Sequence, residues 1–167
     1  MTATRATGSG LLARGFVLLA ETYGKTGQVE EGLATIAEAV AVMEKTGERV
    51  YEVDLYRIKG ELTLQLGTRG WGLGTGPASP QAPSLKPQDP SGEEREAEAW
   101  FLKAIDIARQ QQAKSWELRA VMSLARLWQS QGKTAEARQK LVAIYRWFTE
   151  GFDTQDLQEA KALLEEL

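Results

Sequence analysis

Apolar positions recur with a helical period along most of the chain. Three segments carry an apolar stripe and end in glycine: Gly15–Gly27, Leu55–Gly67 and Ala120–Gly132. Glycine has no Cβ atom and therefore accepts the left-handed conformation that often ends a helix. A second periodic segment follows each of these three, the middle one only after a long interval. The pattern predicts an all-α chain that is built from helix pairs.

The second helices of the three pairs align with one another. A small residue is followed four positions later by a bulky one, and three positions after that by a further apolar residue. The aligned positions are Gly32, Ala97 and Ala137, then Ile36, Phe101 and Leu141, then Ala39, Ala104 and Ile144. Gly27 and Gly67 are 40 residues apart, and Gly67 and Gly132 are 65 apart, which becomes 40 when a 25-residue insertion is set aside. The sequence therefore predicts a repeat with a period of about 40 residues.

The insertion is the stretch Thr68–Gly92, which is rich in Gly, Pro and Ser and contains all five prolines. Because the repeat stays in phase on both sides, we interpret it as a long turn within the second pair and not as a domain linker. Its composition predicts disorder, and a tenfold longer turn costs only about 2 kcal/mol of closure entropy. The glycine run at 70–76 lacks the preceding strand and the Gly-Lys-Ser/Thr of a phosphate loop. Trp71 is its best candidate for docking onto the fold.

Small and bulky residues in both helices of each pair resemble tetratricopeptide repeats. The resemblance rests on Phe16, Leu19, Ala20, Tyr23, Gly32, Ile36 and Ala39 in repeat one, on Tyr56, Gly60, Ala97, Phe101 and Ala104 in repeat two, and on Leu124, Ala125, Trp128, Ala137 and Leu141 in repeat three. It implies a right-handed α-solenoid of three helix pairs in which helices cross closely at the small residues. The repeats depart from the family in their longer period, in the absence of a helix-ending proline, and in Thr63, where an aromatic residue is expected.

We expect a single domain over residues 1–167. Its parts are repeat one at about 11–47, repeat two at about 48–112 with the insertion at 68–92, repeat three at about 113–149, and a capping helix at 154–167. Ser91 and Glu94 predict a capping box at the start of the second helix of repeat two.

The capping helix is predicted from an apolar stripe made of Leu157, Ala160, Leu163, Leu164 and Leu167. Gly151 separates it from the preceding helix, and Asp153 or Thr154 can serve as its N-cap. Residues 113–146 carry seven basic and two acidic side chains, whereas residues 149–167 carry six acidic and one basic. We therefore expect this helix to pack on repeat three, mainly through its leucines. The alternative is that the apolar stripe exchanges between two copies and forms a dimer through the C-terminus.

The chain contains neither Cys nor His. Their absence excludes thiolate and imidazole metal sites, Cys nucleophiles and His-dependent triads, and we expect no cofactor and no catalytic activity. An enzyme that uses Glu or Lys is the weaker alternative. The net charge of −3 argues against nucleic-acid binding. Without an apolar run long enough for a membrane span, a signal peptide or a disulfide, a cytoplasmic protein is expected.

The resemblance also implies a partner groove lined by the first helix of each pair. The corresponding positions are Arg14, Val17, Glu21 and Lys25, then Asp54, Arg57, Glu61 and Gln65, then Arg119, Met122, Arg126 and Gln129. We expect an acidic peptide or partner segment to engage Arg57, Arg119 and Arg126, because guanidinium groups bind carboxylates in a directed way. The alternative interpretation is an exposed face with local pairs such as Arg57 with Glu61.

The aromatic residues at helical spacing are assigned mainly to packing: Trp100, Phe101, Trp116, Trp128, Trp147 and Phe148.

These features predict a protein–protein interaction scaffold. By resemblance to the C-terminal helical regions of bacterial signal-transduction ATPases, cyclase-linked proteins and transcription regulators, it would be the regulatory end of a larger signalling protein. Repeat one begins almost at once, without a polar segment before Leu11, whereas solenoids need polar ends. Either more protein lies upstream, or this end pairs with another copy. Self-association, giving a homo-oligomer, is therefore the second functional hypothesis.

Overall fold

The computed structural model describes residues 6–69 and 90–167. In these two ranges it contains seven α-helices and no strand, which confirms the all-α prediction. The helices are α1 (Ala6–Thr26), α2 (Val29–Thr46), α3 (Glu52–Arg69), α4 (Gly92–Gln110), α5 (Lys114–Ser130), α6 (Thr134–Tyr145) and α7 (Gln155–Glu166). None of them is both long and apolar enough to cross a bilayer.

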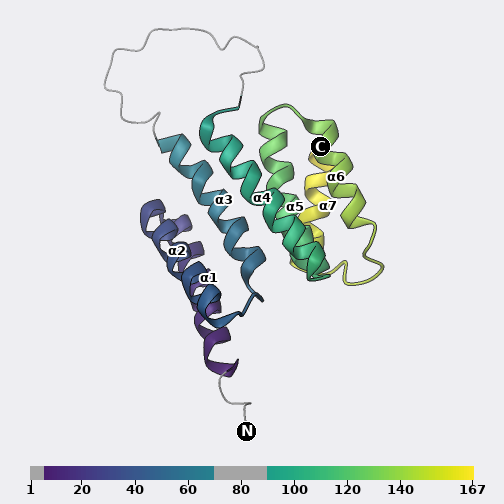
Figure 1. Cartoon of the computed structure of the whole chain (residues 1–167). Helices are drawn as coiled ribbons and strands as arrows, with labels where there is room; N and C mark the ends of the chain where they lie inside the picture. Colours follow the sequence, from purple (N-terminus) through teal and green to yellow (C-terminus); the bar gives the residue numbers. More distant parts are fainter. Residues whose placement is uncertain (1–5, 70–89) are drawn as a thin grey trace, which may run out of the picture.

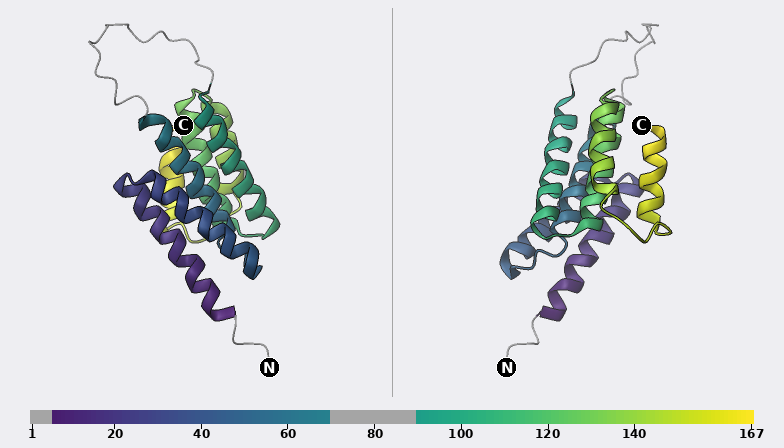
Figure 2. Two further views of the ribbon diagram at one scale, coloured as in Figure 1. Left: turned by 60° about the vertical axis from the view of Figure 1, so that its left-hand side comes forward. Right: turned by 90° about the vertical axis from the view of Figure 1, so that its right-hand side faces the viewer.

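Consecutive helices lie side by side along the molecule (Figure 1). The odd-numbered helices also contact one another in a row, α1 with α3, α3 with α5, and α5 with α7. Within the described helices no Cα atom of α2 lies within 8 Å of one in α4, and the same is true of α4 and α6. The right-hand view of Figure 2 shows α7, in yellow, beside α6. In the row of odd-numbered helices α7 is at the opposite end from α1. One side of the molecule is thus formed by a continuous row of odd-numbered helices.

Glycines end several helices as the sequence predicts. Gly27 and Gly132 have φ of 76° and 77°, in the left-handed region. The prediction is wrong for Gly67, which is not left-handed, because α3 continues through Thr68 to Arg69. Glycine tolerates a helix interior as well as a cap, and no second helix follows at once to force a turn at this point.

The insertion is therefore narrower than the predicted Thr68–Gly92. Thr68 and Arg69 extend α3, and Gly92 is the first residue of α4. Residues 70–89, with Trp71, lie outside the described residues, so the prediction of disorder stays a prediction. The predicted capping box is confirmed, since Ser91 Oγ accepts from Glu94 N at 3.2 Å and Glu94 Oε2 accepts from Ser91 N at 3.0 Å.

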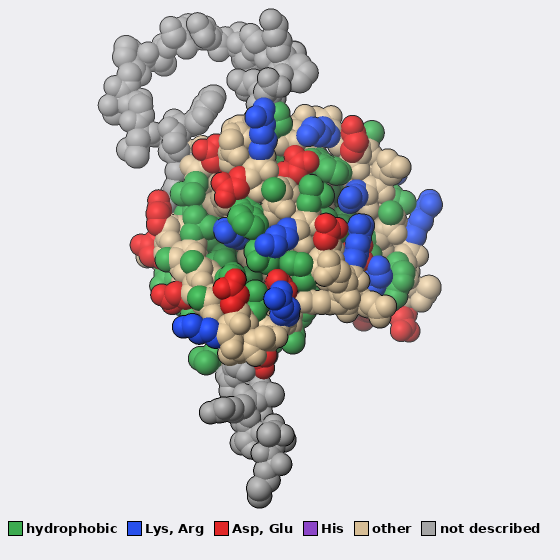
Figure 3. Space-filling model, in the orientation of Figure 1, with side chains coloured by type: hydrophobic (Ala, Val, Ile, Leu, Met, Phe, Trp, Pro, Cys, Tyr) green, Lys and Arg blue, Asp and Glu red, His purple; other side chains and the backbone are tan. Residues whose placement is uncertain are grey.

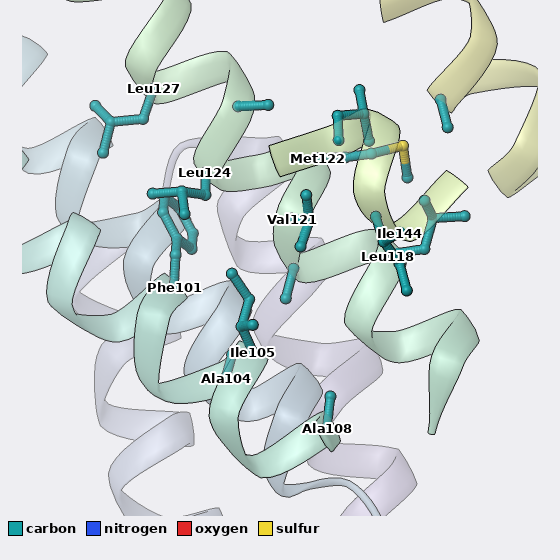
Figure 4. Close-up of a cluster of buried hydrophobic side chains, with 14 of the residues drawn as sticks. Phe101, Ala104, Ile105, Ala108, Leu118, Val121, Met122, Leu124, Leu127 and Ile144 are labelled. Atoms are coloured by element: carbon teal, nitrogen blue, oxygen red, sulfur yellow. The ribbon is translucent and has the colours of Figure 1, made fainter. Parts of the chain in front are cut away.

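Buried side chains form two clusters. The N-terminal cluster joins α1, α2 and α3 through residues such as Ile36 and Leu62. The C-terminal cluster is formed by residues of all five helices from α3 through α7, around Phe101, Val121 and Leu124. Figure 4 shows these side chains between the helices. The clusters share α3, which places Leu55, Ile58 and Leu62 in the first and Val53 and Tyr56 in the second.

The C-terminal helix α7 packs on α5 and α6, as predicted. Leu157, Ala160 and Leu163 are buried in the C-terminal cluster, and Leu164 and Leu167 are half-buried against it. Thr154 is the N-cap by position, but its hydroxyl donates to the carbonyl oxygen of Gly151 and does not cap the helix. Helix formation here depends on the packing of the leucines.

The assignment of Trp147 to packing is wrong, since its side chain is 58% exposed. Helix α6 ends at Tyr145, so Trp147 falls in the turn beyond it, where the helical spacing no longer sets its direction. Its ring meets the edge of Phe148, with centroids 5.2 Å apart, and Lys114 Nζ lies 5.9 Å from the centroid of the ring.

Candidate functional site

Arg57 is the centre of an ion-pair network on α3. Its Nη2 lies 2.9 Å from Glu21 Oε1 on α1, its Nη1 lies 2.9 Å from Glu61 Oε1, and its Nε lies 3.3 Å from Asp54 Oδ1. Burial disfavours the charged guanidinium, but Glu61, Asp54 and Glu21 together raise the pKa of Arg57 above its ordinary value. Arg57 is therefore a permanent, closely held cation.

The network continues along the row of odd-numbered helices. Glu61 Oε1 accepts a hydrogen bond of 2.8 Å from Ser123 Oγ, which links α3 to α5. Arg119 Nε and Arg126 Nη2 then reach α7, at 2.8 Å from Asp156 Oδ2 and 3.4 Å from Glu159 Oε2. We call this series of polar contacts across α1, α3, α5 and α7 the polar seam.

A small cleft of about 230 Å³ opens beside the polar seam, between α1 and α3. Among its lining residues are five of the positions predicted for the partner groove: Glu21, Lys25, Arg57, Glu61 and Gln65. The structure therefore brings these five together from α1 and α3. It does not bring them to Arg119 and Arg126, which lie by α7.

Three predicted groove positions are not open to a partner. Val17, Asp54 and Met122 are buried, at 6%, 6% and 3% exposure. The predicted partner groove assumes that other helices cover the first helix of each pair on one side only. Helix α5 in fact contacts α3, α4, α6 and α7, so a wider arc of its surface is enclosed. Arg14 and Arg126 are exposed, and Gln129 is half-exposed.

The larger cleft, of about 670 Å³, lies elsewhere, between α2, α3 and α4. Its apolar lining includes Leu33, Ile36 and Val40 of α2 and Leu66 of α3. Its other wall carries Tyr56 and Lys59 of α3 with Trp100 and Lys103 of α4, and we call it the aromatic–lysine cleft. In Figure 3, hydrophobic side chains gather on this face among basic and acidic ones.

The aromatic rings of this cleft are stacked. Tyr56 and Trp100 have centroids 5.6 Å apart and planes tilted by 8°. Lys59 Nζ lies 3.8 Å from the centroid of the Trp100 ring, and Lys103 Nζ lies 3.9 Å from that of Tyr56. Both distances are those of cation–π contacts. Trp100 Nε1 donates to Glu96 Oε1 at 3.2 Å, which holds the indole in place.

Burial lowers the pKa of Lys59 below its ordinary value; nearby Glu96 opposes this effect and Lys103 adds to it. The sequence interpretation missed this cleft because it assigned Trp100 to packing. A signal was present: the segments Tyr56–Lys59 and Trp100–Lys103 both place an aromatic residue three positions before a lysine. On a helix this spacing puts the two side chains on one face.

Among the described residues no group of three or more acidic side chains could hold a metal ion. Comparison with protein families, with curated proteins and with solved structures finds no match to this chain. The polar seam and the aromatic–lysine cleft are the two candidate sites in the described part of the chain.

Proposed function

We propose that the chain is a protein–protein interaction scaffold, a right-handed α-solenoid of tetratricopeptide type with α7 as its cap. The row of contacts among odd-numbered helices supports this proposal, since stacked helix pairs bring the first helices of successive repeats together. The resemblance of the repeats extends the proposal to a regulatory module of a larger bacterial signalling protein in the cytoplasm.

The polar seam is the proposed partner surface, and the observation that carries it is the Arg57 network beside the cleft between α1 and α3. Glu21 is one-third exposed and holds Arg57 through its Oε1 atom, 2.9 Å from Nη2. A partner carboxylate could replace it without exposing a buried acid. Arg126 is exposed, and its 3.4 Å contact with Glu159 is the longest ion pair of the seam. An acidic partner segment fits these two arginines.

The test selects short peptides from a displayed library on the intact chain and measures their affinities by calorimetry. Arg126→Glu should weaken the acidic peptides about tenfold or more, because a charge-assisted hydrogen bond becomes a repulsion. Its circular dichroism should not change, since the side chain is exposed. Lys161→Glu makes the same charge change on an exposed part of α7 and serves as the control. Peptides whose binding depends only on residues of α2 and α4 would contradict the proposal.

Self-association is the second candidate, and exposed leucines on α1 favour it. Leu12, Leu18 and Leu19 are 59%, 53% and 43% exposed. A Cβ atom at Gly15 would meet nothing within 4 Å, so another helix can approach closely there. A second copy that covers these leucines would remove their apolar surface from water.

Sedimentation velocity over a concentration series tests this second candidate. The unmodified chain should sediment as a dimer at high concentration, and a Leu18→Glu, Leu19→Glu variant should remain a monomer. Ala41→Glu, at an exposed position of α2, is the control and should leave the dimer intact. A chain that is monomeric at every concentration would reject the candidate.

A further inference from the structure

Among the described residues, the two lysines of the aromatic–lysine cleft have no acidic partner, in contrast to Arg57 of the polar seam, which is held by three carboxylates. In the part of the chain that the structure describes, neither Lys59 nor Lys103 has a carboxylate oxygen within 4.0 Å. Their ammonium groups rest on the rings of Trp100 and Tyr56 instead. The nearby carboxylate of Glu96 is already bound by the Trp100 indole.

Glu93 and Glu96 also line the cleft. An anion that enters it would therefore be attracted only on the side of Lys59 and Lys103, whose ammonium groups contact rings and no carboxylate of the described residues. Lys59 is half-buried, and burial disfavours its charged form. A ligand carboxylate beside it would offset that cost through charge-assisted hydrogen bonds. Tyr56 and Lys59 belong to α3, whereas Trp100 and Lys103 belong to α4 and lie more than forty residues later in the sequence. This wall of the cleft therefore exists only in the folded chain.

The opposite wall of the cleft suits apolar side chains. Leu33, Val40 and Leu66 are half-buried, Ala37 is exposed, and Ile36 lies beneath them at 1% exposure. A volume of about 670 Å³ holds several side chains. The exposed Ala37, Glu93 and Lys103 leave the cleft open to solvent, so a chain can enter and leave it. Open ends favour a segment of polypeptide over an enclosed small molecule.

We propose that the aromatic–lysine cleft binds a peptide segment of a partner protein in which a carboxylate adjoins bulky apolar side chains. The carboxylate binds Lys59 and Lys103, and the apolar side chains contact Leu33, Val40 and Leu66. This site lies on α2, α3 and α4 and is separate from the polar seam.

The experiment titrates the intact, isotope-labelled chain with the blocked tetrapeptide Leu-Asp-Phe-Leu and follows amide and indole resonances. Addition of peptide should shift the Trp100 indole, which Trp100→Phe identifies, and the amide of Ala37. The matched peptide with Asn in place of Asp should bind about tenfold more weakly, the loss expected for a charge-assisted hydrogen bond.

Variants separate the two parts of the site. Lys59→Met and Lys103→Met keep an unbranched side chain but remove the charge, so each should weaken the Asp peptide about tenfold and leave the Asn peptide unchanged. Ala37→Trp should fill the cleft and block both peptides. Lys161→Met, on the exposed side of α7, is the matched control. Arg126→Glu should not affect binding, which separates this site from the polar seam.

Three results would overturn the proposal. The first is the absence of shifts at the cleft with millimolar peptide. The second is equal affinity for the Asp and Asn peptides, which would make the lysines irrelevant. The third is tighter binding of 4-phenylbutyrate than of the peptide, which would assign the cleft to small carboxylates.

Discussion

Among the glycines of the described residues, Gly60 is the one at which an added Cβ atom would come closest to a neighbouring side chain. A Cβ atom at this position would lie 2.5 Å from Cε1 of Phe101, far inside van der Waals contact. Phe101 is fully buried in the C-terminal cluster and has no room to move aside. The absence of a side chain at Gly60 is thus a packing requirement, whereas its helical backbone makes no demand for glycine.

Gly60→Ala should therefore lower the free energy of unfolding by about 1–3 kcal/mol, the usual cost of overpacking a core. Gly15→Ala makes the same change in α1, where a Cβ atom meets nothing within 4 Å. That variant should be more stable by about 0.5–1 kcal/mol, because alanine is the better helix former. Urea unfolding of both variants measures the contrast. Equal effects would show that α3 and α4 are not in close contact at Gly60.

Glu117 joins the start of α5 to α4. Its side chain is 4% exposed and accepts from Arg109 Nε and Lys114 Nζ, each at 2.7 Å. Burial opposes ionisation, but the hydrogen bonds from Lys114 and Arg109 outweigh it and hold the pKa of Glu117 below its ordinary value of 4.5. The folded state thus binds a proton at this carboxylate less readily than the unfolded state does.

Glu117→Gln should reduce the free energy of unfolding at neutral pH by about 1–3 kcal/mol, since two hydrogen bonds to a charged group are weakened. The difference from the unmodified chain should be full above the ordinary pKa of 4.5 and should shrink as the pH falls through the lower folded-state pKa. Urea unfolding at a series of pH values measures it. A difference that grows with acidification would contradict the assigned direction. Glu38→Gln, exposed on α2, should change stability little.

At the scale of helices, the sequence correctly predicted those helix ends that depend only on neighbouring residues. Gly27 ends α1 and the Ser91–Glu94 capping box starts α4, both as expected. Gly67 misled the prediction because its sequence context resembles a helix end, while the conformation depends on whether the next residues leave the helix. The periodic stripe of α7 predicted its burial, since a leucine stripe needs a partner surface.

The candidate sites were harder to predict than the helices. Arg57 and Glu61 are four residues apart on one helix, so their pairing follows from the sequence. The links from Arg57 to Glu21 and from Glu61 to Ser123 depend on how three helices meet. The aromatic–lysine cleft forms only when α3 and α4 are rotated about their axes so that Tyr56 faces Trp100. The spacing of hydrophobic residues does not specify this rotation.

Helix α7 should contribute mainly through its buried leucines. Leu163→Ala should lower the free energy of unfolding by about 2–5 kcal/mol, because the side chain is 4% exposed. Leu12→Ala makes the same change at 59% exposure and should stay within about 0.5 kcal/mol of the unmodified chain. Thermal and urea unfolding measure the stability of both variants.

Truncation after Phe152 removes α7 and should cause aggregation, because it uncovers apolar surface on α5 and α6. A truncated chain of undiminished stability would contradict this role of α7.

At the scale of the whole molecule, α3 and α4 meet next to the insertion. A Cβ atom at Gly67 would lie 3.2 Å from Cβ of Glu93, so the two helices are already adjacent where residues 70–89 leave and return. Replacing residues 70–89 with a short Gly-Ser turn should leave the thermal midpoint almost unchanged, because loop closure depends only weakly on length. A large loss of stability would show that the insertion packs on the fold, with Trp71 as its first candidate anchor. A Trp71→Ala variant of the full chain would then show the same loss.

The sharing of α3 between the two buried clusters has a consequence for how the chain can be divided. A cut within residues 70–89 leaves α1, α2 and α3 on one fragment and α4 to α7 on the other. The first fragment then carries Val53 and Tyr56 without their partners, and the second carries Phe101 without the surface at Gly60 that receives it. Each fragment would therefore lack buried side chains of the C-terminal cluster that the other fragment carries. The chain is accordingly suited to fragment complementation, in which two separately made pieces recover the native fold only when they are mixed.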